Sequence, residues 1–283
     1  MFNKMKAVKK KISQHLRIKI LLLFFIIDIY LLERYYCSKW PNTIFATYKI
    51  KKIKKGLINF HSYSEYYEDI ILYLLLFDIK KGFYIDVGAF DPIKVSVTKL
   101  FYLKGWNGIN IEPQPGKIEL FKKDRPNDIN LQLAIGAKEG NVTFYVKDQC
   151  STYVKKYSNH YENIINIKMD TMSNICKRYV PKGTKIDFCK IDVEGGEKNV
   201  LLGYDFINYR PKVFCIESTI PLTTKPNYIL WEDILIKNNY IFIYSKGVNR
   251  YYVDNLIPGF SERKKYIKKY GKIYFRRGRY TYG

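Results

Sequence analysis

The sequence has few of the residues that build disulfide frameworks or cysteine-rich metal sites. Its 283 residues include three histidines and only five cysteines: Cys37, Cys150, Cys176, Cys189 and Cys215. These cysteines form no CxxC or other ligand spacing. Cys189 and Cys215 stand inside apolar runs, where cysteine behaves as a small buried hydrophobic residue. We therefore expect no disulfide framework and infer a reducing compartment.

Two further absences concern the ligand and the membrane. No G-x-G-x-x-G segment occurs, so the pyrophosphate of a dinucleotide has no obvious cradle. The apolar stretch 20–32 would span about 20 Å as a helix, which is shorter than the hydrocarbon core of about 30 Å. Asp28 also interrupts this stretch.

The positive charge is concentrated in three short segments. Residues 1–19 carry seven basic side chains and no acid, residues 49–55 carry five lysines, and residues 261–283 carry nine basic residues against Glu262. The rest of the chain is close to neutral, although the whole carries a net charge of +23. Such basic segments suit an anionic membrane surface or nucleic acid, and solvated tails of biased composition are the plain alternative.

From Ser64 onward, helical and strand patterns alternate. Strand-length runs are predicted at 82–87, 108–111, 129–135, 141–146, 185–191, 212–216, 240–244 and 248–253. Helical spacing is predicted at 65–77, 96–103, 115–123, 170–179, 196–202 and 228–238. This alternation predicts an α/β domain with a mostly parallel, doubly wound sheet that ends in an antiparallel hairpin. Residues 33–63 are interpreted as a connector and 148–166 as an irregular insertion.

The first motif with chemical meaning is FYIDVGAFDP, residues 83–92. In open parallel sheets, ligands bind outside the carboxyl ends of strands. Gly88 would let the backbone turn and approach a ligand. Asp86 could accept a hydrogen bond from a cationic or amine group, such as the one in an amino-acid-type cofactor with a sulfonium.

A second motif, GINIEP at 108–113, places Glu112 at the end of the next strand. An acid there can accept both ribose hydroxyls of an adenosine. A third segment, LAIG at 133–136, could end along an adenine edge, although an ordinary strand and turn explain it as well.

The fourth motif is IDFCKIDVEGGE at 186–197. Asp192 and Glu194 are two residues apart at a strand end and could accept a proton, bind a cofactor or bind a hard metal ion. A magnesium site would need a third oxygen ligand, which the sequence does not identify. Asp187 and Lys190 are interpreted as facing solvent.

In order and spacing, the four segments resemble the FkbM-type family of class I S-adenosylmethionine-dependent methyltransferases, and IDVEG-x-E is the most specific of them. The resemblance implies the Rossmann-like class I methyltransferase fold with a seven-stranded sheet, and O-methylation of a hydroxyl on a glycan, glycoconjugate or small molecule. It implies S-adenosylmethionine as cosubstrate, contacted by Asp86, Gly88 and Asp192, with Glu112 at the ribose. Asp192 and Glu194 would lie beside the transferred methyl as catalytic residues. We predict no resident metal.

Two positions depart from the family pattern. The usual Ser-Gln-x-Gly-Glu-Asp opening keeps Ser64, Glu68 and Asp69 but lacks its Gln and Gly, so Glu68 is still expected at the cosubstrate. Position 90 is Phe, where Asn or another small or polar residue is common. Both changes concern the acceptor more than the cosubstrate. His160, in the predicted insertion, is a weaker candidate base than the acid pair.

These predictions divide the chain into a basic N-terminal segment at 1–56, a methyltransferase domain at 57–260 and a basic aromatic tail at 261–283. Two alternatives remain: a membrane-anchored glycosyltransferase-like enzyme that uses Asp192-Val193-Glu194 as its metal-binding acids, and a non-catalytic basic binding protein. Nucleic acid is the less favoured partner.

Residues 20–32 leave three interpretations open: a signal-anchor, an interfacial membrane helix, or a helix packed on the domain. We favour membrane association. A spanning segment would keep its basic N-terminal flank in the cytosol and put the domain on the far side, where S-adenosylmethionine is scarce. An interfacial helix keeps the catalytic domain facing the cytosol.

Overall fold

The computed structural model describes residues 46–51, 57–148, 150–158, 161 and 163–267. The chain divides into two compact units, and the second runs from Tyr63. In the first, β1 (Ala46–Lys51) and β2 (Leu57–Ser62) form an antiparallel hairpin, in register from Ala46 opposite Ser62 to Lys51 opposite Leu57. Residues 46–51 and 57–62 of the predicted connector at 33–63 are therefore paired strands. Residues 20–32 lie outside the described residues.

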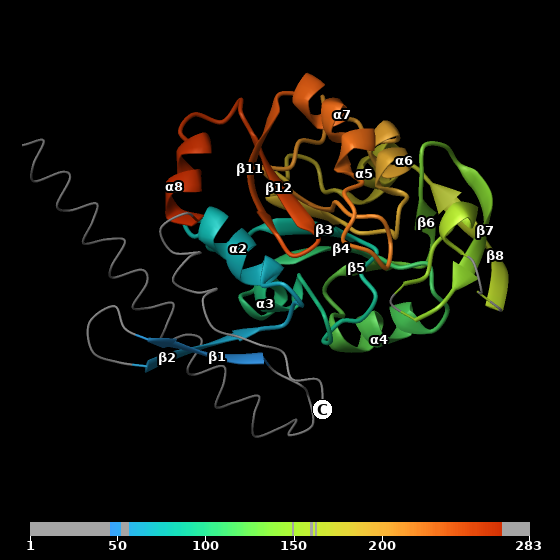
Figure 1. Cartoon of the computed structure of the whole chain (residues 1–283), viewed down its shortest axis with the longest axis horizontal. Coiled ribbons are helices and arrows are strands. Elements are labelled where there is room, and N and C mark those ends of the chain that lie inside the picture. The colour runs from blue at the N-terminus through green and yellow to red at the C-terminus, as the bar shows by residue number, and fades with distance from the viewer. Residues whose placement is uncertain (1–45, 52–56, 149, 159–160, 162, 268–283) are drawn as a thin grey trace, which may run out of the picture. The chain divides into compact units, whose positions relative to one another are not determined.

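The second unit is built on a seven-stranded sheet with the order β11-β12-β10-β9-β3-β4-β5 (Figure 1). The strands β3, β4, β5, β9 and β10 are parallel, and β12 runs antiparallel between β10 and β11. Their bounds are β3 (Phe83–Val87), β4 (Asn107–Ile111), β5 (Ile129–Leu131), β9 (Phe188–Ile191), β10 (Val213–Glu217), β11 (Tyr240–Lys246) and β12 (Asn249–Asp254). The predicted mostly parallel sheet with a closing antiparallel hairpin is confirmed.

Helices cover both faces of this sheet, which is why its central strands are apolar almost throughout. Ile85 of β3 belongs to a core on one face that also holds Ile175 and Leu235, whereas Tyr84 belongs to a core on the other face that holds Leu72 and Phe101. The first face is covered by α5 (Met172–Tyr179), α6 (Glu197–Leu202) and α7 (Glu232–Lys237), and the second by α2 (Glu68–Leu75) and α3 (Lys99–Leu103). The other helices of the described residues are α4 (Lys117–Asp124), α8 (Lys264–Tyr266) and the short 3-10 turns 155–157, 228–230 and 261–263.

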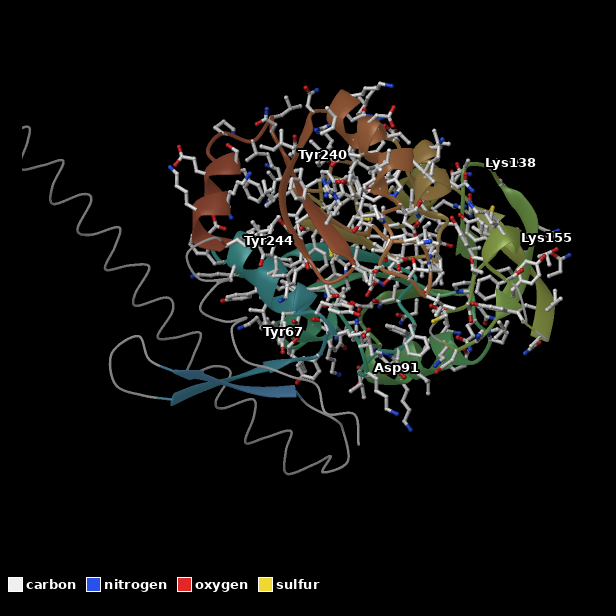
Figure 2. The ribbon with its side chains drawn as sticks, viewed as in Figure 1. Tyr67, Asp91, Lys138, Lys155, Tyr240 and Tyr244 are labelled. Carbon is white, nitrogen blue, oxygen red and sulfur yellow. The ribbon has the colours of Figure 1, made fainter. Side chains whose placement is uncertain are left out.

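A separate three-stranded sheet contains β6 (Ala134–Ile135), β8 (Asn163–Asp170) and β7 (Gly140–Val146). It corrects two predictions. The strand predicted at 129–135 divides into β5 and β6, which belong to different sheets, and residues 163–166 are regular because they pair along β7. Lys138 and Lys155, in the segments around this sheet, are exposed (Figure 2).

The order of the strands also determines where a ligand can bind. The chain passes from β3 outward through β4 to β5 and then returns to β9 and β10 on the other side of β3. Ligands of open α/β sheets bind outside the carboxyl ends of the strands at such a reversal. Within the described part of the chain, no helix is long and apolar enough to cross a membrane.

Candidate active site

A cavity of about 640 Å³ opens at the carboxyl ends of the strands on both sides of this reversal. That volume lies in the usual range of ligand pockets. Of the residues expected at the site, Gly88, Glu112, Asp192 and Glu194 line the cavity, and so do the apolar residues 133–135. Asp86 and Glu68 are not among the lining residues.

Gly88 is required by the backbone that faces it. Its φ is +75°, and a Cβ atom at this position would lie 1.8 Å from the carbonyl oxygen of Asp192. Only glycine therefore allows the turn after β3 to approach the turn after β9. From the sequence, we expected Gly88 to let the backbone approach a ligand. In the structure, the glycine is required because the turn after β9 lies against it.

Glu112 is buried and held in place by two backbone donors. The N–H of Phe90 donates to Oε2 and the N–H of Gln114 donates to Oε1, each at 2.8 Å. Burial raises the pKa of its carboxyl group, against the effect of these hydrogen bonds. Because a carboxylate has about four acceptor sites, Glu112 keeps capacity for a ligand. Phe90, at φ +54°, also lines the cavity, and the Lys117 ammonium lies 3.8 Å from the centre of its ring.

The carboxylate of Asp86 interacts with two side chains of the protein itself, those of Thr98 and Lys190. Its Oδ2 accepts from the Thr98 hydroxyl at 2.8 Å, and its Oδ1 lies 3.5 Å from the Lys190 ammonium. Parallel register places Lys190 directly beside Asp86 on the neighbouring strand. The sequence predicted that a cationic group of the cofactor would lie near Asp86, whereas in the structure the Lys190 ammonium occupies that position.

The solvent-facing interpretation of Lys190 and Asp187 is wrong. Lys190 is only 7% exposed, and its ammonium donates to the Gly88 carbonyl at 2.5 Å and lies 3.6 Å from Asp192 Oδ2. Burial lowers the pKa of Lys190, but the carboxylates of Asp192 and Asp86 outweigh it and raise the pKa above its usual value. Asp187 is 4% exposed and accepts from the Phe83 N–H and the Lys212 ammonium.

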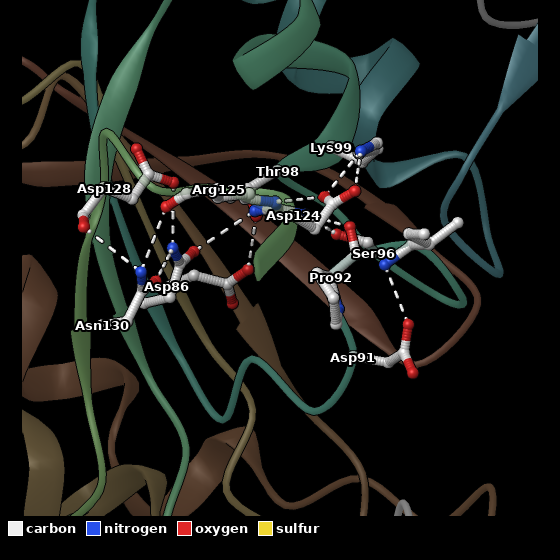
Figure 3. A network of polar contacts seen from close by, with 12 residues as sticks. Asp86, Asp91, Pro92, Ser96, Thr98, Lys99, Asp124, Arg125, Asp128 and Asn130 are labelled. Atoms are coloured by element: carbon white, nitrogen blue, oxygen red, sulfur yellow. Dashed lines mark hydrogen bonds and ion pairs between the residues drawn. The ribbon is translucent and has the colours of Figure 1, made fainter. Parts of the chain in front are cut away.

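Arg125, which sequence reasoning missed, is bonded to the segment that follows β3 (Figure 3). Its guanidinium is fully buried and donates to the carbonyl of Pro92 at 2.5 Å and to the hydroxyls of Ser96 and Thr98 at 2.6 Å. These bonds connect the end of α4 to the segment between β3 and α3. The sequence signal was weak, because an arginine at a helix end is usually exposed.

Four carboxylates lie close together around the turn after β9. Glu197 is fully buried, and it accepts from the N–H groups of Val193 and Gly195 and from the Asn227 amide. Burial and the neighbouring Asp192 and Glu197 raise the pKa of Glu194 to about 8. Burial and Asp192 likewise raise the pKa of Glu217, at the end of β10, well above its ordinary value. Sequence reasoning did not select Glu217, although it is the last residue of an otherwise apolar strand.

The segment around 150–153 forms a further wall of the cavity. Cys150, Ser151 and Tyr153 line it. Thr152 donates through its hydroxyl to the Glu194 carbonyl at 2.8 Å, and Tyr153 donates to the Gly196 carbonyl at 3.1 Å. The predicted insertion therefore contacts the acid-bearing turn. His160 lies outside the described residues.

Glu68 does not line the cavity, but it is hydrogen-bonded to a residue that does. It is 4% exposed, and its carboxylate accepts from the Asn249 amide at 2.7 Å and from the Tyr66 N–H at 2.8 Å. Burial raises the pKa of Glu68 to about 7. Glu68 thus holds the backbone of Tyr66, which itself lines the cavity.

The strand order, with its single antiparallel strand, and a cavity over the reversal define the class I methyltransferase fold. The model of the methyltransferase FkbM domain matches residues 86–242, a little over half of the chain. The chain belongs to the FkbM methyltransferase family, and the family expected from its four motifs is confirmed.

One solved structure similar to this chain is the methyltransferase FkbM from Methylobacillus flagellatus KT, at 13% identity and a TM-score of 0.39. The similarity covers 61% of this chain, which spans only 43% of that protein. No curated protein matches the sequence.

Proposed function

We propose that this methyltransferase takes its methyl group from S-adenosylmethionine and transfers it to a hydroxyl group of a glycan, a glycoconjugate or a small molecule. The observation that carries the proposal is the position of Glu112. It is a buried carboxylate on the cavity wall, fixed by two backbone N–H groups and with acceptor capacity left for a pair of ribose hydroxyls.

The rest of the cavity fits the same cosubstrate. The apolar side chains at 133–135 offer a surface for an adenine ring, and Gly88 lines the same cavity. Acidic side chains outnumber basic ones among the described residues that line the cavity, which favours a cationic ligand such as a sulfonium. When bound, S-adenosylmethionine supplies an electrophilic methyl group.

The chain's own contribution is to hold the acceptor oxygen in line and to remove its proton. Positioning accounts for much of the rate in such displacements, and a base within hydrogen-bond reach adds to it. Asp192 and Glu194 are the candidates because both line the cavity and the Asp192 side chain is 32% exposed. The segment around 150–153 is proposed to contact the acceptor.

Calorimetric titration of the full chain with S-adenosylhomocysteine tests the cosubstrate. Losing a hydrogen bond to a charged group costs about 1.5–3 kcal/mol, so Glu112→Gln should weaken binding by about 10- to 100-fold. Glu119→Gln is the matched control, because Glu119 is exposed on α4 and pairs only with Lys122 among the contacts described. Absence of binding to wild type, or equal binding by Glu112→Gln, would contradict the proposal.

A location at an anionic membrane surface, with the domain facing the cytosol, is proposed from the basic segments and the apolar stretch 20–32. The test is co-sedimentation of the full chain with phosphatidylserine vesicles and with neutral vesicles. Binding should favour the anionic vesicles and fall as salt is added. Equal binding to both would count against it.

A further inference from the structure

Three carboxylates in the cavity come together from two strand ends. Asp192 and Glu194 follow β9 and Glu217 ends β10, and each can offer one oxygen within 4.8 Å of the others. The sequence indicated that Asp192 and Glu194 could bind a hard metal ion, but it did not identify a third ligand. The pairing of β9 with β10 supplies that ligand.

The spacing is compatible with one divalent cation. Magnesium and calcium bind oxygen at about 2.0–2.6 Å. In octahedral geometry, neighbouring ligand oxygens are then about 3–3.7 Å apart and opposite ones about 4–5 Å. Three oxygens within 4.8 Å of one another can therefore share one ion, and solvent or a ligand can complete its coordination.

Glu217 supplies an independent observation. The residue is 6% exposed, and its Oε2 is buried and accepts no hydrogen bond from any residue that the structure describes. A buried carboxylate without a partner is strongly unfavourable. Its neighbour Glu197, in contrast, is satisfied by two backbone N–H groups and an amide. Glu217 also lines the cavity, so the missing partner can reach it from there.

The ammonium that pairs with this acidic cluster, that of Lys190, is already engaged. Lys190 donates to the Gly88 carbonyl and pairs with Asp86 and Asp192. Among the ion pairs of the described residues, none joins a cation to Glu194 or Glu217, although both lie with Asp192 in the trio. A divalent cation would supply the opposite charge and favour the ionised forms of these carboxyl groups.

We propose that Asp192, Glu194 and Glu217 bind one divalent metal ion in the cavity, contrary to the metal-free site expected from the sequence. The ion's role in transfer rests on the proposed function. A hydroxyl acceptor bound to such an ion has a lowered pKa and a fixed position, which selects acceptors whose oxygen can reach the ion. The binding of the ion itself does not depend on that activity.

The test uses the full chain after treatment with EDTA and dialysis. Manganese binding is measured by electron paramagnetic resonance of the free ion, with competition by magnesium and calcium. We expect one saturable manganese site per chain. Glu217→Gln should weaken manganese affinity by at least about 10-fold, because even the loss of a residue that only orients a metal ligand has an effect of that size.

Asp148→Asn is the matched control, because Asp148 lines the same cavity but its side chain is 79% exposed and it lies outside the trio. It should bind manganese as wild type does. At a fixed manganese concentration, the melting temperature of wild type should rise more than that of Glu217→Gln. Asp192→Asn provides a second variant if Glu217→Gln does not fold.

Two results would overturn the inference: no stoichiometric binding by wild type at millimolar manganese, or unchanged affinity in whichever of the two trio variants folds. Titration with S-adenosylhomocysteine in EDTA separates this failure from that of the proposed function. Binding of S-adenosylhomocysteine without any manganese site contradicts only the metal inference. A manganese site without binding of S-adenosylhomocysteine supports the metal inference and contradicts the proposed cosubstrate.

Discussion

Replacing Lys190 with methionine should strongly destabilise the fold, because this buried ammonium holds two strand ends together. The methionine keeps the length of the side chain but removes the hydrogen bond to Gly88 and the pairs with Asp86 and Asp192. A pair of unit charges 3.5 Å apart interacts by about 5 kcal/mol at an effective dielectric constant of about 20.

Part of that attraction is offset, because burying the ammonium removes its hydration and Asp192 is partly exposed to solvent. The net loss expected when one partner of a buried pair is removed is about 3–5 kcal/mol. Urea denaturation at pH 7, followed by circular dichroism, measures it. Since the pKa of Lys190 is raised, its stabilising contribution is fully present below the unfolded pKa of about 10.4 and is lost only as the pH rises through the folded value.

Lys212→Met is the matched control. Lys212 pairs with Asp187 at 2.6 Å, but its side chain is 23% exposed. It should therefore lose only about 1–2 kcal/mol, between the values for surface and buried pairs. A loss below about 1 kcal/mol for Lys190→Met, which is the value of a surface pair, would refute the assigned burial of this ammonium.

Three further substitutions test other parts of the site. Glu68→Gln should gain stability relative to wild type by about 2–3 kcal/mol between about pH 5 and pH 8. In wild type, the pKa of Glu68 is about 7 in the folded protein and about 4.5 in the unfolded chain. Wild type therefore loses stability as the pH rises from the unfolded pKa through the folded pKa. Gly88→Ala should destabilise the fold by more than about 1 kcal/mol, because its Cβ would overlap the Asp192 carbonyl. Arg125→Met should lose about 3–5 kcal/mol, since it leaves the buried Pro92 carbonyl and the Ser96 and Thr98 hydroxyls without their donor.

Denaturation in urea measures all three. A stability difference for Glu68→Gln that does not change with pH would contradict the assignment of that carboxyl group. Gly105→Ala is the control for Gly88→Ala, because Gly105 has a similar φ of +80° but nothing within 4 Å of an added Cβ. Equal losses of stability would show that the positive φ, and not the overlap with the Asp192 carbonyl, causes the destabilisation. A loss below about 1 kcal/mol for Arg125→Met would show that its donors are replaced by solvent.

Much of the fold was predictable because its signals are local. The apolar run before Asp86 and the helical spacing after it depend on neighbouring residues, and this alternation led to the parallel sheet. The limits of elements were less accurate. Residues 228–238, for example, form a 3-10 turn and then α7, with Trp231 between them, rather than one helix.

The cavity was only partly predictable. Gly88, Glu112, Asp192 and Glu194 stand at strand ends in the sequence, and the reversal of strand order brings strand ends together. The pairing of Asp86 with Lys190 depends on strand register, which the sequence does not display. A lysine within an apolar parallel strand was nevertheless a signal, because such a side chain is buried only when it is paired.

The sequence by itself determined the order of helices and strands, the family, and the strand ends that carry Asp86, Glu112 and the acid pair. Short-range periodicity and turn residues encode these features directly. The tertiary structure alone decided that Lys190 is buried, that Arg125 supports the turn after β3, and that Glu217 joins Asp192 and Glu194. Each of these contacts joins residues that are distant in the chain, and strand pairing and helix packing bring them together.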